Sequence, residues 1–135
     1  MFLQPKKKKF KKEQKGRLKF LAYKANKIVF GNFGLQAKES GTISARQLEA
    51  ARQAINRKIK RKGKVWIRVF PDKPITKKPT EVRMGKGKGS VAYWVTKVRA
   101  GTIIFELCGT TLQKSVLAFK TGGAKLPVKT QIIKH

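Results

Sequence analysis

The residue types on which catalysis and metal binding depend are scarce in this chain. Its 135 residues include one cysteine, one histidine and 6 Asp+Glu. The single cysteine, Cys108, excludes an intramolecular disulfide and a CxxC zinc site. It directly follows an apolar run, so we interpret it as a buried, unreactive thiol. The histidine is residue 135 and the acids are scattered. We therefore expect no catalytic site, no metal and no other cofactor.

Long apolar stretches are also missing. No run of about 18 apolar residues could span a bilayer. The basic residues are spread over the whole chain rather than gathered on one amphipathic helix, so we expect no membrane partner. The first thirty residues lack the apolar segment of a secretory signal, and they are rich in Lys rather than in the Arg and Ser of transit peptides. We interpret them as mature protein.

Positive charge is abundant. The 34 Lys+Arg against 6 Asp+Glu give a formal net charge of +28. Self-repulsion of this size opposes compaction, so the fold is expected to require a polyanion, and nucleic acid is the polyanion that rewards many dispersed cations. Hydrophobic residues make up 40% of the chain, which allows one modest core and one domain.

Residues 1–28 form the most cationic region. Eleven Lys and Arg are opposed there only by Glu13, and Phe10, Phe20 and Tyr23 are interleaved among them. A solvated tail is one interpretation of such a block. The aromatic residues favour the other, an extended basic arm that becomes ordered on RNA.

Residues 44–62 carry the clearest helical pattern. Ser44 and Gln47 form a capping-box pattern, and Gly63 stands at the expected stop. One stripe is apolar and predicts the core side of the helix. The helix carries seven cations against Glu49 alone. A helix whose polar side is exposed only to water is stabilised by pairs of opposite charge, and this helix has almost no acids to form them. We therefore expect the basic side to face phosphate. The stripe consists of Ala45, Leu48, Ala51, Ile55 and Ile59.

The other elements are predicted from alternation and turn residues. The strand at 27–35 contains two glycines that suggest a bend where another backbone approaches. Trp66, Arg68 and Phe70 alternate along a second strand, either as a base-stacking platform or, as we favour, packed under a helix. The expected elements are strands at 27–35 and 64–70, a long loop at 71–90, a hairpin of 91–98 with 102–107, a short helix capped by Thr110 with Gln113 and ended by Gly122-Gly123, and a final strand at 127–133.

The segment Gly85-Lys86-Gly87-Lys88-Gly89 is the sharpest local feature. Its singly alternating glycines do not fit a Walker loop, which has four residues between its glycines and a helix after them. A dinucleotide fingerprint would need a third glycine at Ser90. A flexible solvated loop is one alternative. We favour a mobile tip whose amides and lysines become ordered against RNA.

These pieces, in this order, resemble the bacterial-type ribosomal protein L-sixteen family of the large subunit. The resemblance covers nearly the whole chain and is most specific in the middle. It is carried by 3–6 with Phe10 and 15–17, by 30–35, by 45–47 with 49–52, by 64–76 with 78–79 and 82–89, and by 124–127 with 129–130.

The resemblance implies a compact α+β sandwich of mainly antiparallel sheet with two helices, in which domain 29–135 follows the arm 1–28. It also implies a non-enzymatic protein that binds large-subunit rRNA near the base of the central protuberance. The arm and the long loop would reach towards A-site tRNA and the peptidyl-transferase region. Neighbouring large-subunit proteins are expected partners, and a stable homo-oligomer is not. The expected rRNA-binding residues are Lys6, Lys7, Lys8, Lys9, Lys11, Lys12, Lys15, Arg17, Arg46, Arg52, Arg57, Lys60, Arg61 and Arg68, and the expected tRNA-proximal residues are Arg83, Met84, Gly85, Lys86, Gly87, Lys88 and Gly89.

The resemblance weakens after Phe105. Gly122 and Gly123 replace helix-forming alanines, at roughly 2 kcal/mol for the pair, so the last helix is expected to end early. Lysine greatly outnumbers arginine, as an AT-rich genome would produce. This favours a mitochondrial ribosome, with the bacterial cytoplasm or a plastid as alternatives. The rival functions are a free RNA- or DNA-binding protein and an RNA-modifying or nucleotide-using enzyme.

Overall fold

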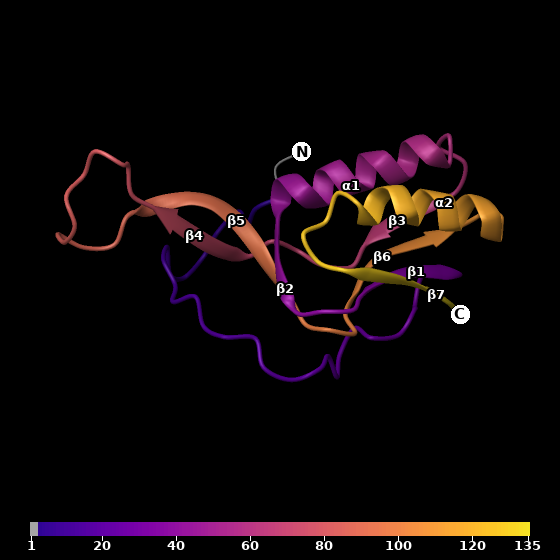
Figure 1. The fold of residues 1–135 in the computed structure, drawn as a ribbon, viewed down its shortest axis with the longest axis horizontal. Helices are drawn as coiled ribbons and strands as arrows, with labels where there is room; N and C mark the ends of the chain where they lie inside the picture. The colour runs from indigo at the N-terminus through magenta and orange to yellow at the C-terminus, as the bar shows by residue number, and fades with distance from the viewer. Residues whose placement is uncertain (1–2) are drawn as a thin grey trace.

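The structure is a computed structural model that describes residues 3–135 (Figure 1). The first two residues of the predicted arm lie outside this range. The elements in chain order are β1 (Phe33–Ala37), β2 (Gly41–Ser44), α1 (Ala45–Lys58), β3 (Lys64–Ile67), β4 (Lys73–Lys77), β5 (Ser90–Val98), β6 (Ile103–Cys108), α2 (Leu112–Gly123) and β7 (Thr130–Lys134). The α+β class with two helices and antiparallel strands is confirmed.

The strands form two separate sheets. The four-stranded sheet has the order β3-β6-β1-β7, and the three-stranded sheet has the order β2-β5-β4. Both helices lie side by side on one face of the four-stranded sheet, while β4 and β5 extend away from this body as a long ribbon (Figure 1). The ribbon and its loop therefore project from the domain, and the core lies between the helices and the four-stranded sheet.

Helix α1 forms as its local sequence predicts. Ser44 accepts a hydrogen bond from the Gln47 backbone N–H, and the Gln47 side chain accepts one from the Ser44 N–H. Leu48, Ala51 and Ile55 are fully buried. The helix ends earlier than predicted, because the two residues at 60–61 adopt left-handed φ angles of 53° and 60°. Gly63 is still required there, since a Cβ would lie 2.3 Å from the Cys108 carbonyl oxygen.

Helix α2 differs from its prediction at its first residues. Its N-cap is Thr111, without a side-chain capping bond, whereas Thr110 hydrogen-bonds the Ser115 hydroxyl. The helix includes both glycines and ends at Gly123, as the Gly122-Gly123 pair predicted. At Gly122 a Cβ would lie 2.5 Å from Ile55 Cγ1, so this glycine lets α2 approach α1 closely. The glycine pair thus marks the end of the helix, and Gly122 also permits close packing.

Two strand predictions were wrong. β5 and β6 do not form a hairpin with each other: β5 pairs with β2 and β4, while β6 pairs with β1 and β3. The turn at 99–102 therefore carries the chain from one sheet to the other. Part of the predicted loop 71–90 is strand β4, whose Pro74 is tolerated because β4 is an edge strand. The loop proper spans residues 78–89.

The first strand begins later than predicted, at Phe33, because the amides of residues 29–31 are hydrogen-bonded to Glu106 and not to a strand. The predicted close approach is present at Gly31, where a Cβ would lie 2.7 Å from the Leu107 carbonyl oxygen. Trp66 packs against the ring of Phe30, not under a helix, with the ring centroids 6.1 Å apart. Segment 28–31 therefore covers the sheet face opposite the helices.

Candidate nucleic-acid interface

The loop between β4 and β5 presents backbone and cations in an open arrangement. Residues 83–88 are all exposed. Gly85 and Gly87 adopt φ angles of 97° and 90°, and a Cβ on either would meet no atom within 4 Å. These two glycines are thus needed for backbone conformation and not for space. Lys78 donates to the Gly85 carbonyl and closes the loop on itself.

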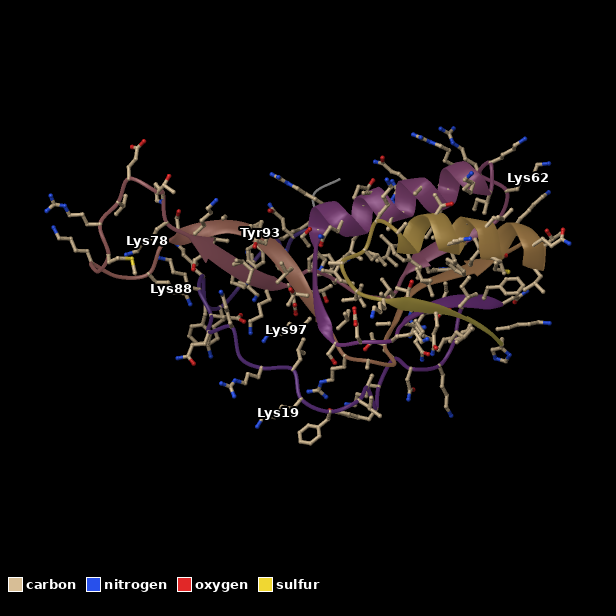
Figure 2. The ribbon with its side chains drawn as sticks, viewed as in Figure 1. Lys19, Lys62, Lys78, Lys88, Tyr93 and Lys97 are labelled. Atoms are coloured by element: carbon tan, nitrogen blue, oxygen red, sulfur yellow. The ribbon has the colours of Figure 1, made fainter. Side chains whose placement is uncertain are left out.

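The N-terminal arm runs beside this ribbon and is hydrogen-bonded to it. Lys12 donates to the Lys88 carbonyl at 2.9 Å, and Lys88 donates to the Glu13 carbonyl at 2.5 Å. Further along β5, Lys97 donates to the carbonyls of Lys15 and Gly16. Lys88 and Lys97 lie on the side of the ribbon along which the arm passes (Figure 2). Arm and loop, far apart in sequence, form one surface.

The arm is fixed to the domain at several points, although it has no regular secondary structure. Leu3 is buried with the core residues at one end, and Ile28 is buried at the other. Between them, the Ala22 N–H donates to the Ala100 carbonyl, and the Ile103 N–H donates to the Ala25 carbonyl. These contacts attach the arm to the domain along its length.

Glu106 secures the end of the arm from inside the domain. Its fully buried carboxylate accepts the N–H groups of Phe30 at 2.6 Å, Gly31 at 2.9 Å and Val29 at 3.2 Å. It also forms an ion pair with Arg68. Burial by itself would raise the pKa of Glu106, but the three N–H groups and Arg68 outweigh it and lower this pKa below its usual value.

Arg68 is thus held by the protein itself. Its guanidinium pairs with Glu106 and lies over the Phe30 ring, 5.0 Å from the centroid. Its side chain is only 15% exposed. Among the residues predicted to bind rRNA, Arg68 is therefore the one whose charge is paired inside the fold, with Glu106.

The cations of α1 form a second, separate surface. Arg46, Arg57, Lys60 and Arg61 are exposed, whereas Arg52 is half-buried. Arg52 forms two hydrogen bonds with Glu49, and these lower the pKa of Glu49 to about 2. In Figure 1 the helices lie above the four-stranded sheet, and the arm passes below the ribbon. In this view the exposed side of α1 and the part of the arm below the ribbon therefore lie on different sides of the molecule.

We name these two regions by their residues. The arm–loop surface comprises the arm cations together with residues 78–89, and the α1 surface comprises the exposed cations of 46–61. Sequence patterns missed Lys73 and Lys97 of the sheet, which face the arm, because their position depends on how β4 and β5 pair. They also missed Glu106, which stood among six scattered acids with no local sign of its buried partners.

Within residues 3–135, no three His, Cys, Asp or Glu side chains lie close enough together to hold a metal ion. No helix in that range is long and apolar enough to cross a membrane.

Comparison with known proteins gives consistent matches over nearly the whole chain. The family model described as ribosomal protein L16p/L10e matches residues 5–133. The large ribosomal subunit protein uL16 of Dichelobacter nodosus (strain VCS1703A) is 58% identical over 128 residues, which cover 95% of this chain and 93% of that protein. The protein of the same name from Francisella tularensis subsp. holarctica (strain LVS) is 56% identical over 131 residues, covering 97% and 96%.

Proposed function

This chain belongs to the ribosomal protein L16p/L10e family, and from that premise we propose that it binds large-subunit rRNA near the base of the central protuberance and helps to position A-site tRNA near the peptidyl-transferase centre. As a member of this family it is a constituent of the large ribosomal subunit. Its role is non-enzymatic: the protein supplies charge and shape, and its expected partners are rRNA, A-site tRNA and neighbouring subunit proteins.

The observation that carries this proposal is the joining of arm and loop. Lys12 and Lys88 each donate to a backbone carbonyl of the other segment, so the cationic arm and the cationic loop reach the same end of the molecule. A protein whose cations lie on opposite sides can be embedded between RNA elements, with α1 towards one and the arm–loop surface towards another. Dispersed phosphate contacts of this kind favour binding within structured RNA.

The rivals fit less well. A free nucleic-acid-binding protein would need a cationic surface, but not an arm and loop fixed to each other by specific hydrogen bonds. An enzyme would need clustered acids, histidines or a phosphate loop of the right spacing.

The compartment is proposed from composition alone. The lysine bias favours a mitochondrial ribosome in our proposal, whereas the relatives named above are bacterial and are equally consistent with the bacterial cytoplasm. The proposed role of the arm–loop surface is the same in either compartment.

The lysines at the loop tip provide the test. We expect Lys86→Ala with Lys88→Ala to weaken A-site tRNA binding by about tenfold, since each lysine is expected to contribute the roughly 0.7 kcal/mol of an exposed ion pair. Yield and sedimentation of the large subunit should change less than tRNA binding. The measurement is equilibrium binding of aminoacyl-tRNA to purified ribosomes that carry the variant.

The control removes the same charge elsewhere. Lys114→Ala with Lys120→Ala alters two exposed lysines of α2, which lies away from the loop (Figure 1). It should leave tRNA binding near the wild-type value. Unchanged tRNA binding by the loop variant, together with blocked subunit assembly, would contradict the proposal.

A further inference from the structure

The arm contains a single carboxylate, Glu13, and that carboxylate lies among lysines of three segments. One Glu13 oxygen is 2.5 Å from Lys8 Nζ, and the other is 3.7 Å from Lys73 Nζ on β4. The hydrogen bond from Lys8 is the main cause of the lowered pKa of Glu13, and Lys73 adds to it. The only acid of the arm is thus used as an internal counterion.

Lys97 of β5 completes the cluster. Removal of water from its ammonium lowers the pKa of Lys97, the nearby charge of Lys73 lowers it further, and Glu13 acts in the opposite direction. Two ammonium groups on neighbouring strands therefore repel each other. An anion near both ammonium groups reduces this repulsion, and the Glu13 carboxylate is that anion.

These side chains line a polar cavity between the arm and the three-stranded sheet. Its volume is about 460 Å³, and it is bordered by Lys8, Glu13, Phe70, Asp72, Lys73, Thr96 and Lys97. Small-molecule sites commonly measure roughly 300–1,000 Å³, so a phosphate group fits. Phe70 is 49% exposed at its edge, and the cavity is therefore reachable from solvent.

We propose that Lys8, Lys73 and Lys97 form a phosphate-binding site that Glu13 occupies in the free protein, and that an RNA phosphodiester replaces the Glu13 carboxylate when rRNA binds. This inference rests on the proposed function. A carboxylate and a phosphodiester each present one negative charge on oxygen, so the exchange leaves the charge of the site unchanged. The phosphodiester additionally releases counterions from the RNA, which favours the exchange.

The exchange gives Glu13 a defined role before RNA is bound. It pairs with Lys8 and Lys73 and offsets part of their positive charge, and it keeps this part of the arm against β4 and β5. An ion pair that merely stabilised the arm would have the opposite consequence for binding, because its loss would disorder the arm and weaken RNA affinity. Whether RNA affinity rises or falls when the Glu13 charge is removed therefore distinguishes the two roles.

The experiment measures binding of the full chain to a fluorescein-labelled oligouridylate by anisotropy over a salt series. We expect Glu13→Gln to bind roughly two- to fivefold more tightly than wild type, the range for one partly exposed ion pair that no longer competes. Glu81→Gln is the matched control, since it adds the same net charge at an exposed position in the loop. It should tighten binding less. Glu13→Asp, which keeps the carboxylate, should resemble wild type.

A second set of variants tests whether the effect of Glu13→Gln depends on the lysines of this site. With Lys73→Ala and Lys97→Ala already present, Glu13→Gln should no longer tighten binding. Weaker binding by Glu13→Gln, tightening equal to that of Glu81→Gln, or an effect that persists without the two lysines would each overturn the site. Failure of the wild-type protein itself to bind the oligouridylate at low salt would instead contradict the proposed function.

Discussion

Among residues 3–135, Glu106 is the one charged side chain that is buried. A buried carboxylate is costly unless its oxygens are satisfied, and here three backbone N–H groups and Arg68 satisfy them. Its partners belong to segment 29–31 and to the residue that follows β3. One side chain therefore joins the arm, the sheet edge and the central strand β6. The sequence could show that Glu106 interrupts an apolar run, but not which groups would surround it.

We expect Glu106→Gln to lower the free energy of unfolding by about 3 kcal/mol at neutral pH, because Arg68 and the nest of N–H groups lose their charged partner. The folded pKa of Glu106 lies below its usual value of 4.5, so the ionised carboxylate stabilises the fold above that pH. Its contribution is lost as the pH falls through the folded pKa. Urea unfolding from pH 7 downwards should show the difference between wild type and variant shrinking below pH 4.5.

The control is Glu39→Gln, which removes an exposed carboxylate that accepts one backbone N–H, from Lys129. Its cost should be about 1 kcal/mol or less. An equal cost for the two variants would contradict the role given to Glu106.

For helix α1, sequence patterns correctly predicted the features that depend on residues close together in the chain. The capping box and apolar stripe of α1 lie within one turn or face of the helix, and both were confirmed. In α2 the apolar residues do not form a buried stripe: Phe119 is buried, whereas Leu112 and Val116 are 52% and 38% exposed. The buried face of α2 also includes Ser115, Ala118 and Gly122. These small residues allow α2 to lie close to its neighbours, as Gly122 does against Ile55 of α1.

Strand pairing was the least predictable feature. β5 and β6 are adjacent in sequence and joined by a turn, which is the pattern of a hairpin. They enter different sheets because β6 is paired on both sides by β3 and β1, and β5 by β2 and β4. Long-range partners therefore override the short connection. The same long-range pairing places Lys73 and Lys97 beside the arm, which explains why the cavity around Glu13 could not be anticipated.

Gly122 allows a test of the helix–helix contact. Alanine is favoured over glycine in a helix by about 1 kcal/mol. We nevertheless expect Gly122→Ala to destabilise the protein by about 1 kcal/mol, because the new Cβ would press on fully buried Ile55 and overpacking costs roughly 1–3 kcal/mol. Gly123→Ala has the same propensity gain and faces the Thr130 hydroxyl, which can rotate, so it should be close to neutral. Urea denaturation of both variants measures this difference, and a stabilised Gly122→Ala protein would contradict the packing.

Across the whole molecule, many of the 34 Lys and Arg residues lie on the α1 surface and the arm–loop surface, and the others are spread over the rest of the chain. Lys62 and Lys88 mark two distant ends of this distribution (Figure 2). Composition alone indicated a polyanionic partner, and the resemblance indicated which one. The three-dimensional arrangement adds that the arm contacts the domain through Leu3, Glu13 and Ile28.

Cleavage by hydroxyl radicals from a tethered iron chelate tests whether the loop tip lies beside A-site tRNA within the large subunit. The chelate would be attached at Lys86→Cys in a Cys108→Ser background, with Lys114→Cys on α2 as the control. We predict that radicals from position 86 cleave large-subunit rRNA and the aminoacyl end of A-site tRNA, whereas those from position 114 cleave rRNA but not that tRNA end. Absence of tRNA cleavage from position 86, or equal tRNA cleavage from both positions, would contradict the account.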